Sequence, residues 1–183
     1  MLDVVSTQTR KLSVLVSGLL DVSRISTGRL ELHLEPVDLV ALVREVAHAF
    51  EAEAAKADCA LRLRLAEEPV VGRWDRLRLE QVVTNLLTNA LKYGAGRPVE
   101  VALASVDGRA LLAVRDEGIG IAAESQARIF EKFERAVSDR HYGGLGLGLY
   151  ITREIARALG GGVSVESEPG RGALFTVSLP LGS

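Results

Sequence analysis

Two asparagines, Asn85 and Asn89, stand one helical turn apart within the segment 80–93, and Lys92 and Tyr93 follow them. At about 100° per residue, these four side chains share one narrow arc of a helix. The opposite, inner arc should face the core and consists of Leu79, Val83, Leu86, Leu87 and Ala90. Asparagine is a poor helix former, so helix stability alone does not explain the pair. An amide oxygen is a hard, neutral ligand that suits Mg²⁺, and a lysine one turn further on suits a phosphate. A solvated polar helix face is the alternative, and this segment by itself leaves both open.

A second group of candidate residues is Asp116 with Gly118 and Gly120, directly after the apolar run 111–114. A carboxylate at the end of a strand, followed by two glycines, predicts a tight turn whose backbone is open to a ligand. In a pocket, that carboxylate can accept a hydrogen bond from an exocyclic amine. A turn without function is the alternative.

A third group lies in the segment 143–149, where glycine alternates with leucine before a predicted helix. Backbone N–H groups of such a segment can approach an anion at the start of the helix. The segment is not a P-loop because no Lys-Ser or Lys-Thr follows, and it lacks the dinucleotide spacing G-x-G-x-x-G. We therefore favour a phosphate cradle over a flexible linker. We expect the glycines to hold the phosphates and the leucines to pack beneath: Gly144, Gly146 and Gly148, with Leu145, Leu147 and Leu149.

The elements that must position these groups come in blocks of helices and strands. The predicted helices cover about 2–30, 38–57 (capped by Asp38), 76–93 (capped by Asp75), a short stretch within 117–143, and 146–159. The predicted strands cover 60–65, 70–71, 99–106, 110–116, 163–168 and 173–179, and a turn at Asp107-Gly108 joins 99–106 to 110–116. This order indicates an α+β fold with a mixed sheet covered by helices. The first helix has an apolar seam of coiled-coil spacing, so it either folds back on its own domain or forms half of a helical hairpin.

Composition excludes several classes of protein. The 183 residues carry 22 Lys and Arg against 24 Asp and Glu, so nothing favours a nucleic-acid partner. Hydrophobic residues make up 48% and charged residues 25%, which is typical of a soluble globular chain. The single cysteine, Cys59, excludes an intrachain disulfide and a multi-cysteine metal site. Because the chain has no signal pattern and no apolar stretch long enough to span a bilayer, we expect it to be cytoplasmic, without membrane contact.

The motifs together resemble those of sensor histidine kinases. Their order is N-x-x-x-N-A-x-K-Y, D-x-G-x-G, F-x-K-F at Phe130–Phe133, G-x-G-x-G, and G-x-G-x-x-F at Gly170–Phe175. They are similar to that family's N, G1, F, G2 and G3 boxes. Leu19–Ile25 and Glu35–Leu39 resemble the second helix of the family's dimerisation and phosphotransfer hairpin running into the kinase domain. The resemblance implies a hairpin segment and linker over 1–34 and a catalytic domain over 35–183. That domain is a two-layer α/β sandwich shared with DNA gyrase, Hsp90 and MutL, with a mostly antiparallel sheet covered on one face.

The resemblance also implies the ligands, ATP and Mg²⁺, and a role for each matching residue. Asn89 would bind Mg²⁺ with help from Asn85, Lys92 would contact phosphate, and Tyr93 would flank the adenine or ribose. Asp116 would accept the adenine amino group and so select ATP over GTP. Residues from Ile121 to 143 would form a lid over the nucleotide. The remaining implied contacts are the anchors Phe130 and Phe133, the lid cations Arg135 and Arg140, and the segment Gly144–Leu149.

Three departures from the family pattern affect these expectations. The phosphoacceptor motif H-E-x-x-T/N-P is absent, and His33, His48 and His141 lack its context. We therefore expect that this chain does not autophosphorylate by itself and is part of a longer kinase. Leu145 and Leu174 replace a hydroxyl residue and a threonine that are common in the family, which weakens expected contacts to phosphate and base. Asn85 replaces the glutamate of related ATPases, and an amide cannot act as a general base, so we expect little hydrolysis.

The implied partners are the phosphoacceptor hairpin of a parent kinase, which could itself be membrane-anchored, and a response-regulator receiver domain. Pairing of residues 2–30 would give a homodimer. Two alternatives remain: a serine kinase of the anti-sigma type, which shares the nucleotide fold but lacks the hairpin, and a nucleotide-responsive dimerisation module without enzymatic activity.

Overall fold

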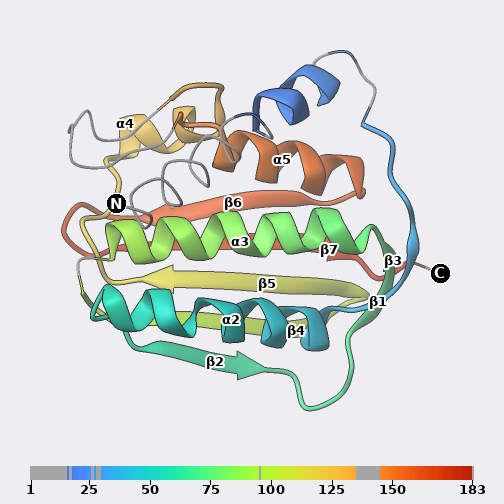
Figure 1. The fold of residues 1–183 in the computed structure, drawn as a ribbon, viewed down its shortest axis with the longest axis horizontal. Coiled ribbons are helices and arrows are strands. Elements are labelled where there is room, and N and C mark those ends of the chain that lie inside the picture. The colour runs from blue at the N-terminus through green and yellow to red at the C-terminus, as the bar shows by residue number, and fades with distance from the viewer. Residues whose placement is uncertain are drawn as a thin grey trace, which may run out of the picture.

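The computed structural model describes residues 16, 18–25, 27, 30–94, 96–134 and 145–182. Its centre is a five-stranded sheet in the order β2-β4-β5-β7-β6 (Figure 1). The strands are β2 (Leu61–Leu65), β4 (Val99–Val106), β5 (Arg109–Asp116), β6 (Gly162–Ser167) and β7 (Ala173–Pro180). Only β2 and β4 pair in parallel, and the other neighbours are antiparallel. The predicted α+β fold with a mixed, mostly antiparallel sheet is confirmed.

Helices cover one face of this sheet. They are α2 (Leu39–Lys56), α3 (Arg76–Tyr93) and α5 (Gly148–Ala158), with the short α4 (Ala123–Gln126) and the 3-10 helix η1 (Arg128–Phe130) at one end (Figure 1). The Asp38 side chain accepts a hydrogen bond from the Val40 N–H, and Asp75 accepts one from Arg78. Both predicted N-caps are thus confirmed, and each fixes where its helix begins.

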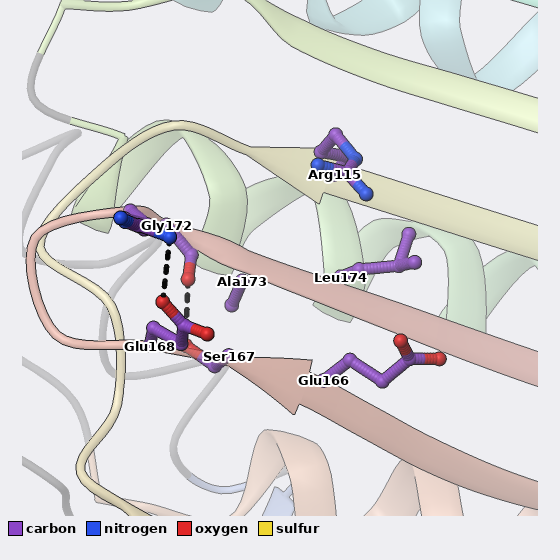
Figure 2. Close-up of a pocket in the computed structure, with 8 residues that line it drawn as sticks. Arg115, Glu166, Ser167, Glu168, Gly172, Ala173 and Leu174 are labelled. Atoms are coloured by element: carbon purple, nitrogen blue, oxygen red, sulfur yellow. Dashed lines mark hydrogen bonds and ion pairs between the residues drawn. The ribbon is translucent and has the colours of Figure 1, made fainter.

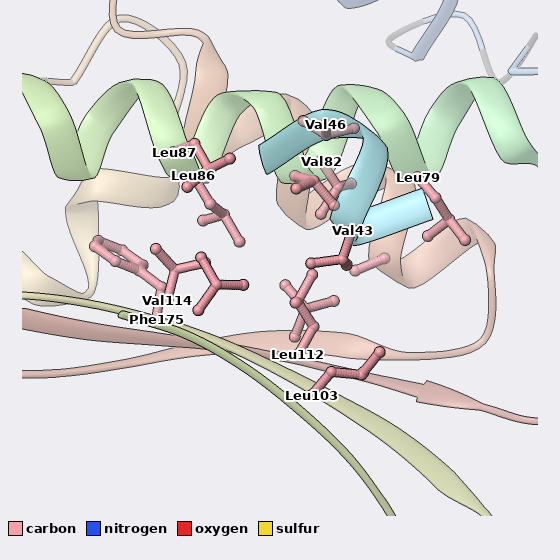
Figure 3. Close-up of a cluster of buried hydrophobic side chains, with 14 of the residues drawn as sticks. Val43, Val46, Leu79, Val82, Leu86, Leu87, Leu103, Leu112, Val114 and Phe175 are labelled. Atoms are coloured by element: carbon pink, nitrogen blue, oxygen red, sulfur yellow. The ribbon is translucent and has the colours of Figure 1, made fainter. Parts of the chain in front are cut away.

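The core lies between α3 and the sheet. The predicted inner arc of α3 is buried, and its leucines and valines face the alternating inward residues of β4, β5 and β7 (Figure 3). The buried α3 residues are Leu79, Val82, Val83, Leu86, Leu87, Ala90 and Leu91. Because this arc is anchored to the sheet, the polar arc of the same helix is held in a fixed direction on the opposite side.

A small ribbon closes one edge of the domain. β1 (Glu35–Asp38) pairs antiparallel with β3 (Val71–Trp74), and the side chain of Trp74 is fully buried. Its indole N–H donates to the Pro180 carbonyl at 2.9 Å, which ties the ribbon to the end of β7. The indole lies over Gly72, where an added Cβ would meet the ring at 2.4 Å. The sequence prediction missed β1 and had only a short strand at 70–71, because neither segment shows alternation long enough to be recognised.

The helix predicted over residues 2–30 ends earlier than expected. Among the described residues the helix runs to Ile25, and Leu30 is not helical, so the predicted end at residue 30 is wrong. The Thr27 hydroxyl donates to the carbonyls of Ser23 and Arg24, at 2.9 and 3.2 Å, which offers the backbone an alternative to further helix. Residues 1–15 lie outside the described part, so the rest of the apolar seam stays a prediction.

Candidate functional site

The polar arc of α3 carries both asparagines, and each is half-buried. The Asn85 Nδ2 donates to the Gly148 carbonyl at 3.1 Å and lies 3.4 Å from the Thr152 hydroxyl. Thr152 is fully buried, so α5 fixes which way the Asn85 amide turns. The amide nitrogen is engaged by α5, and no described residue donates to the amide oxygen. Sequence reasoning missed Thr152, because a lone threonine inside an amphipathic helix gives no signal.

Asn89 and Lys92 continue this arc towards the end of α3. In the described part of the chain, the Asn89 amide has no protein hydrogen-bond partner, although it is half-buried. The Lys92 ammonium lies 4.6 Å from the centre of the Tyr93 ring, at cation–π distance. An amide oxygen and an ammonium therefore lie one turn apart on one face.

Asp116 ends β5 on the helix-covered side of the sheet and is only 5% exposed. Its Oδ1 accepts a hydrogen bond from the Gly118 N–H at 2.9 Å. Burial raises the pKa of this carboxyl above its ordinary value, and hydrogen bonds from the backbone N–H groups of Gly118 and Ala173 oppose that rise. Because the two hydrogen bonds do not fully offset the cost of burial, a further hydrogen-bond donor would stabilise the ionised form of this carboxyl.

The turn after Asp116 lies against the end of α3. The Ile119 N–H donates to the Tyr93 carbonyl at 3.2 Å, and a Cβ at Gly118 would come within 1.8 Å of that same oxygen. Gly120 has a φ of 68°, and a Cβ there would lie 2.0 Å from the Glu168 carbonyl. Both glycines are therefore required by close backbone approach, which places the predicted D-x-G-x-G turn beside the predicted N-x-x-x-N helix.

The segment that follows the turn is held by side chains that the sequence did not reveal. The Ile121 N–H donates to the Ser167 hydroxyl at 2.8 Å, and this hydroxyl donates to the Gly172 carbonyl at 2.6 Å. Gln126 donates to the carbonyls of Ile121 and Ser167. Ile121 is thereby fixed between the G1-like turn and the loop that links β6 to β7.

The two phenylalanines of the F-x-K-F motif behave differently. Phe130 is buried and meets the Phe175 ring edge to face, with 6.4 Å between ring centres. Phe133 is 58% exposed and has a φ of 64°, so the expectation that it also anchors the segment is wrong for this conformation. Among the described residues, Phe130 is the member of the pair that makes a ring contact.

The glycine–leucine motif leads into α5 as predicted. Leu147 is buried and Leu149 is half-buried. Leu145 is 38% exposed, so the expectation that it packs beneath the turn is wrong. Gly146 has a φ of 69°, and a Cβ there would lie 2.6 Å from the Glu134 carbonyl. Gly144 and the predicted lid cations Arg135 and Arg140 lie outside the described residues.

A surface pocket lies elsewhere, at the end of the sheet face that the helices leave open (Figure 2). It is lined by Arg115, Glu166, Ser167, Glu168, Arg171, Gly172, Ala173 and Leu174. Successive residues of a strand point to opposite faces, so Arg115 faces this pocket while Asp116 faces the helices. The pocket therefore lies on the opposite face of the sheet from Asp116, and the G-x-G-x-x-F segment contributes Gly172 and Leu174 to its lining.

The donor set on α3 can hold only certain cations. Among the described residues no three His, Cys, Asp or Glu side chains converge as a metal site. A cation at Asn85 and Asn89 would have two neutral amide oxygens from the protein. This set fits a hard ion such as Mg²⁺ that takes its remaining ligands from phosphates and water.

A family model described as histidine kinase-, DNA gyrase B- and HSP90-like ATPase matches residues 74–183. This match covers α3, the turn at Asp116 and the glycine motif in one stretch. The chain belongs to this family. Its fold is that of the ATP-binding catalytic domain of sensor histidine kinases.

Curated relatives of the chain are sensor kinases. It is 36% identical to the alginate biosynthesis sensor protein KinB of Pseudomonas aeruginosa over 99% of this chain and 30% of KinB. It is 37% identical to the sensor histidine kinase RppB of a Synechocystis species over 99% of this chain and 40% of RppB. The chain thus spans less than half the length of these relatives. Their names do not favour the serine-kinase or non-enzymatic alternatives.

Solved structures agree. Full-length ShkA in complex with AMPPNP is 34% identical, with a TM-score of 0.83 over 93% of this chain and 36% of ShkA. The Acinetobacter baumannii histidine kinase AdeS is 30% identical, with a TM-score of 0.80 over 96% of this chain and 81% of the AdeS chain. Within the described residues, no helix is both long and apolar enough to span a membrane.

Proposed function

We propose that this chain is the Mg-ATP-binding kinase domain of a two-component sensor histidine kinase, joined to the second helix of its phosphotransfer hairpin. In this proposal the hairpin segment and linker cover 1–34 and the catalytic domain covers 35–183. The γ-phosphoryl group goes to a histidine outside these 183 residues, because the phosphoacceptor motif is absent from them. Transfer from there to a response-regulator receiver domain completes the proposed pathway.

One observation supports this proposal most directly: the C-terminal half of α3 is contacted by both other motifs. The Asp116 turn reaches it through the Ile119–Tyr93 backbone hydrogen bond, and the glycine motif reaches it through the Asn85–Gly148 hydrogen bond. Motifs spread over more than 60 residues of sequence thereby surround one stretch of one helix. A nucleotide bound along this stretch would have its base at the Asp116 turn and its phosphates at the glycine motif.

The proposed roles follow this arrangement. Asp116 accepts the adenine amino group, which selects ATP because guanine has a carbonyl oxygen at that place on its ring. Tyr93, Gly118, Gly120 and Ile121 line the base and ribose side.

On the phosphate side, the α3 amides hold Mg²⁺ and Lys92 contacts phosphate. The rest of the proposed phosphate side is Phe133, Arg135, Arg140, Gly144, Leu145, Gly146, Leu147, Gly148 and Leu149. Bound Mg-ATP supplies the phosphoryl group and the neutralising charge.

The chemistry is transfer rather than hydrolysis. A histidine ring nitrogen attacks the γ-phosphorus, the bond to the β,γ-bridging oxygen breaks, and ADP leaves with that electron pair. Asn85 cannot remove a proton from water at neutral pH, so this chain has no general base at the position where related ATPases carry glutamate. The protein's contribution is to orient the nucleotide and to exclude water.

The test is calorimetric titration of the 183-residue chain with a non-hydrolysable ATP analogue and with the matching GTP analogue, each with Mg²⁺ and with a chelator. We expect the ATP analogue to bind at least about tenfold more tightly than the GTP analogue, because one charged hydrogen bond to the base is lost with guanine. Binding should weaken when Mg²⁺ is removed. Equal affinity for both analogues, or no binding at all, would refute the proposal.

A second measurement separates the kinase classes. The chain is incubated with radiolabelled ATP and with the isolated phosphotransfer hairpin of KinB. Label that is lost in acid and kept in base indicates phosphohistidine, whereas acid-stable label on a serine would support the anti-sigma-type alternative.

A further inference from the structure

A buried ionic cluster joins the helical segment 18–25 to the first turns of α3. The Arg78 Nη1 lies 2.8 Å from the Asp21 Oδ1, and the Gln81 Nε2 donates to the Asp21 Oδ2 at 2.7 Å. Arg78 also donates to the Gln81 Oε1 at 3.0 Å, so the three side chains form a closed network. The side chains of Asp21 and Arg78 are only 10% and 12% exposed. Nearly 60 residues of sequence separate the two sides of this contact.

The docked face of the segment is regular. Gly18, Asp21, Val22 and Ile25 follow the spacing i, i+3, i+4 and i+7 of one helix face. Val22 and Ile25 pack against the core of the domain, and a Cβ at Gly18 would lie 3.8 Å from Leu147, the residue before α5. In Figure 1 this segment, in dark blue, lies beside α5.

The opposite face of the segment remains uncovered in the described chain. Val16, Leu19 and Leu20 are 50%, 48% and 55% exposed, although all three are apolar. Val16 and Leu19 point nearly half a turn away from Asp21, and Leu20 points just over a quarter of a turn away. The segment can therefore pack against a further hairpin helix while its Asp21 face stays docked on the ATP-binding domain. Contact with the domain is compatible with an assembled hairpin.

The cluster adjoins the nucleotide residues without including them. Arg78, Gln81, Asn85 and Asn89 lie at i, i+3, i+7 and i+11 on one face of α3. At 1.5 Å rise per residue, Gln81 and Asn89 are about 12 Å apart along the helix axis. The same helix thus presents a carboxylate-binding end and a nucleotide end, and the first can be changed without touching the second.

A second attachment holds the linker to the same end of α3. The His33 N–H donates to the Asp75 Oδ2 at 2.9 Å, and the residues that follow it pair as β1 with β3. On the linker side this attachment is made by backbone groups, whereas the Asp21 contact is made by side chains on both sides. The side-chain contact can open while the ribbon stays paired.

We propose that Asp21, Arg78 and Gln81 form a conformational latch that fixes the orientation of the ATP-binding domain on the hairpin helix. This rests on the proposed function, because the orientation decides whether the nucleotide can face a histidine on the hairpin. Removal of one charge leaves the other uncompensated in a nearly dry site, so the closed state becomes unfavourable. Charge-assisted hydrogen bonds of this kind shift an equilibrium by about tenfold to a hundredfold.

The test uses the 183-residue chain with spin labels at Arg24→Cys and Glu80→Cys, both exposed positions, in a Cys59→Ala background. Dipolar electron resonance then measures the distance between the segment and α3. We expect one narrow distance in the parent, and a broad or longer distribution in Asp21→Arg and in Arg78→Glu. The double variant should restore the narrow distance, since Gln81 can donate or accept. Glutamate is compatible with the first turn of a helix, so Arg78→Glu should still fold.

The matched control is Glu45→Gln, which removes a different carboxylate that pairs with Arg76 on the same turn of α3. It should leave the distance unchanged. Unchanged distances in both single variants, or a double variant that melts normally but stays open, would overturn the latch. Nucleotide titration of the same samples judges the proposed function separately, because the latch variants leave Asn85, Asn89 and Asp116 in place.

Discussion

Replacing Asp116 by asparagine should separate nucleotide binding from folding stability. The carboxyl is 5% exposed, and burial raises its pKa above the ordinary value of 3.8 despite two backbone hydrogen bonds. Ionisation of this carboxyl is therefore less favourable in the folded domain than in the unfolded chain, and a neutral amide of similar shape avoids that cost. A nucleotide whose amino group donates to this position would instead prefer the carboxylate.

The two effects have opposite signs. A hydrogen bond to a charged acceptor contributes about 1.5–3 kcal/mol, so the variant should bind an ATP analogue roughly ten- to a hundredfold more weakly. Its stability should not fall in parallel. A raised folded-state pKa contributes stability that is fully present below the unfolded pKa and is lost as the pH rises through the folded pKa. Relative to the parent, Asp116→Asn should therefore gain stability as the pH rises above about 4, where the parent carboxyl ionises in the unfolded chain.

Calorimetric titration and urea denaturation across this pH range provide the assay. The parent's affinity should decline as the pH drops through the raised pKa of Asp116, while the variant's affinity stays level. A folded Asp116→Asn variant whose affinity matches the parent's within twofold would refute the assignment of the base to this residue. Parallel loss of stability and affinity would show that the carboxylate has a structural role instead.

Three further substitutions test the remaining geometry. Asn89→Ala should abolish the Mg²⁺ dependence of nucleotide affinity, which titration with and without a chelator would measure. It should also raise helix stability by about 0.5 kcal/mol in thermal melting, because alanine is the better helix former. Retained Mg²⁺ dependence would contradict the assignment. Thr152→Val removes the hydroxyl that lies beside the Asn85 amide and should cost about 1 kcal/mol of stability and several-fold in nucleotide affinity. Thr152→Ser keeps the hydroxyl and should keep the affinity. Equal behaviour of the two variants would show that the hydroxyl does not orient Asn85. Gly118→Ala forces a methyl group to 1.8 Å from a carbonyl oxygen and should cost about 3 kcal/mol of stability in urea denaturation. The control Gly162→Ala, whose added Cβ has nothing within 4 Å, should cost almost nothing. Similar costs at both glycines would show that the backbone of the turn moves to accommodate the methyl group.

The sequence was sufficient for features that depend on local chemistry. Asp38 and Asp75 could be recognised as caps because a short acceptor before an apolar periodic segment has few other uses. The inner arc of α3 followed from period 3.6, and the hairpin at Asp107-Gly108 followed from its turn residues, which have φ values of 50° and 72°. These elements also place Asn85 on the polar arc of α3 and Asp116 on the helix-covered face of the sheet.

The remaining features depend on contacts that no local pattern encodes. Thr152 matters only because α5 passes beside Asn85, and Asp21 matters only because the helical segment 18–25 lies against Arg78. Leu145 and Phe133 show the reverse error: their motif predicted burial, but the final packing leaves them exposed. Nothing in the sequence around any of these residues distinguishes the two outcomes.

Trp74 gives the domain a built-in optical reporter. It is the only tryptophan in the chain, its ring has no exposed surface, and its N–H is bound to the last residue of β7. Its emission therefore reads the closure of the β1–β3 ribbon onto the sheet, with no competing indole signal. Stability changes in every variant above can be followed by fluorescence without attaching a dye.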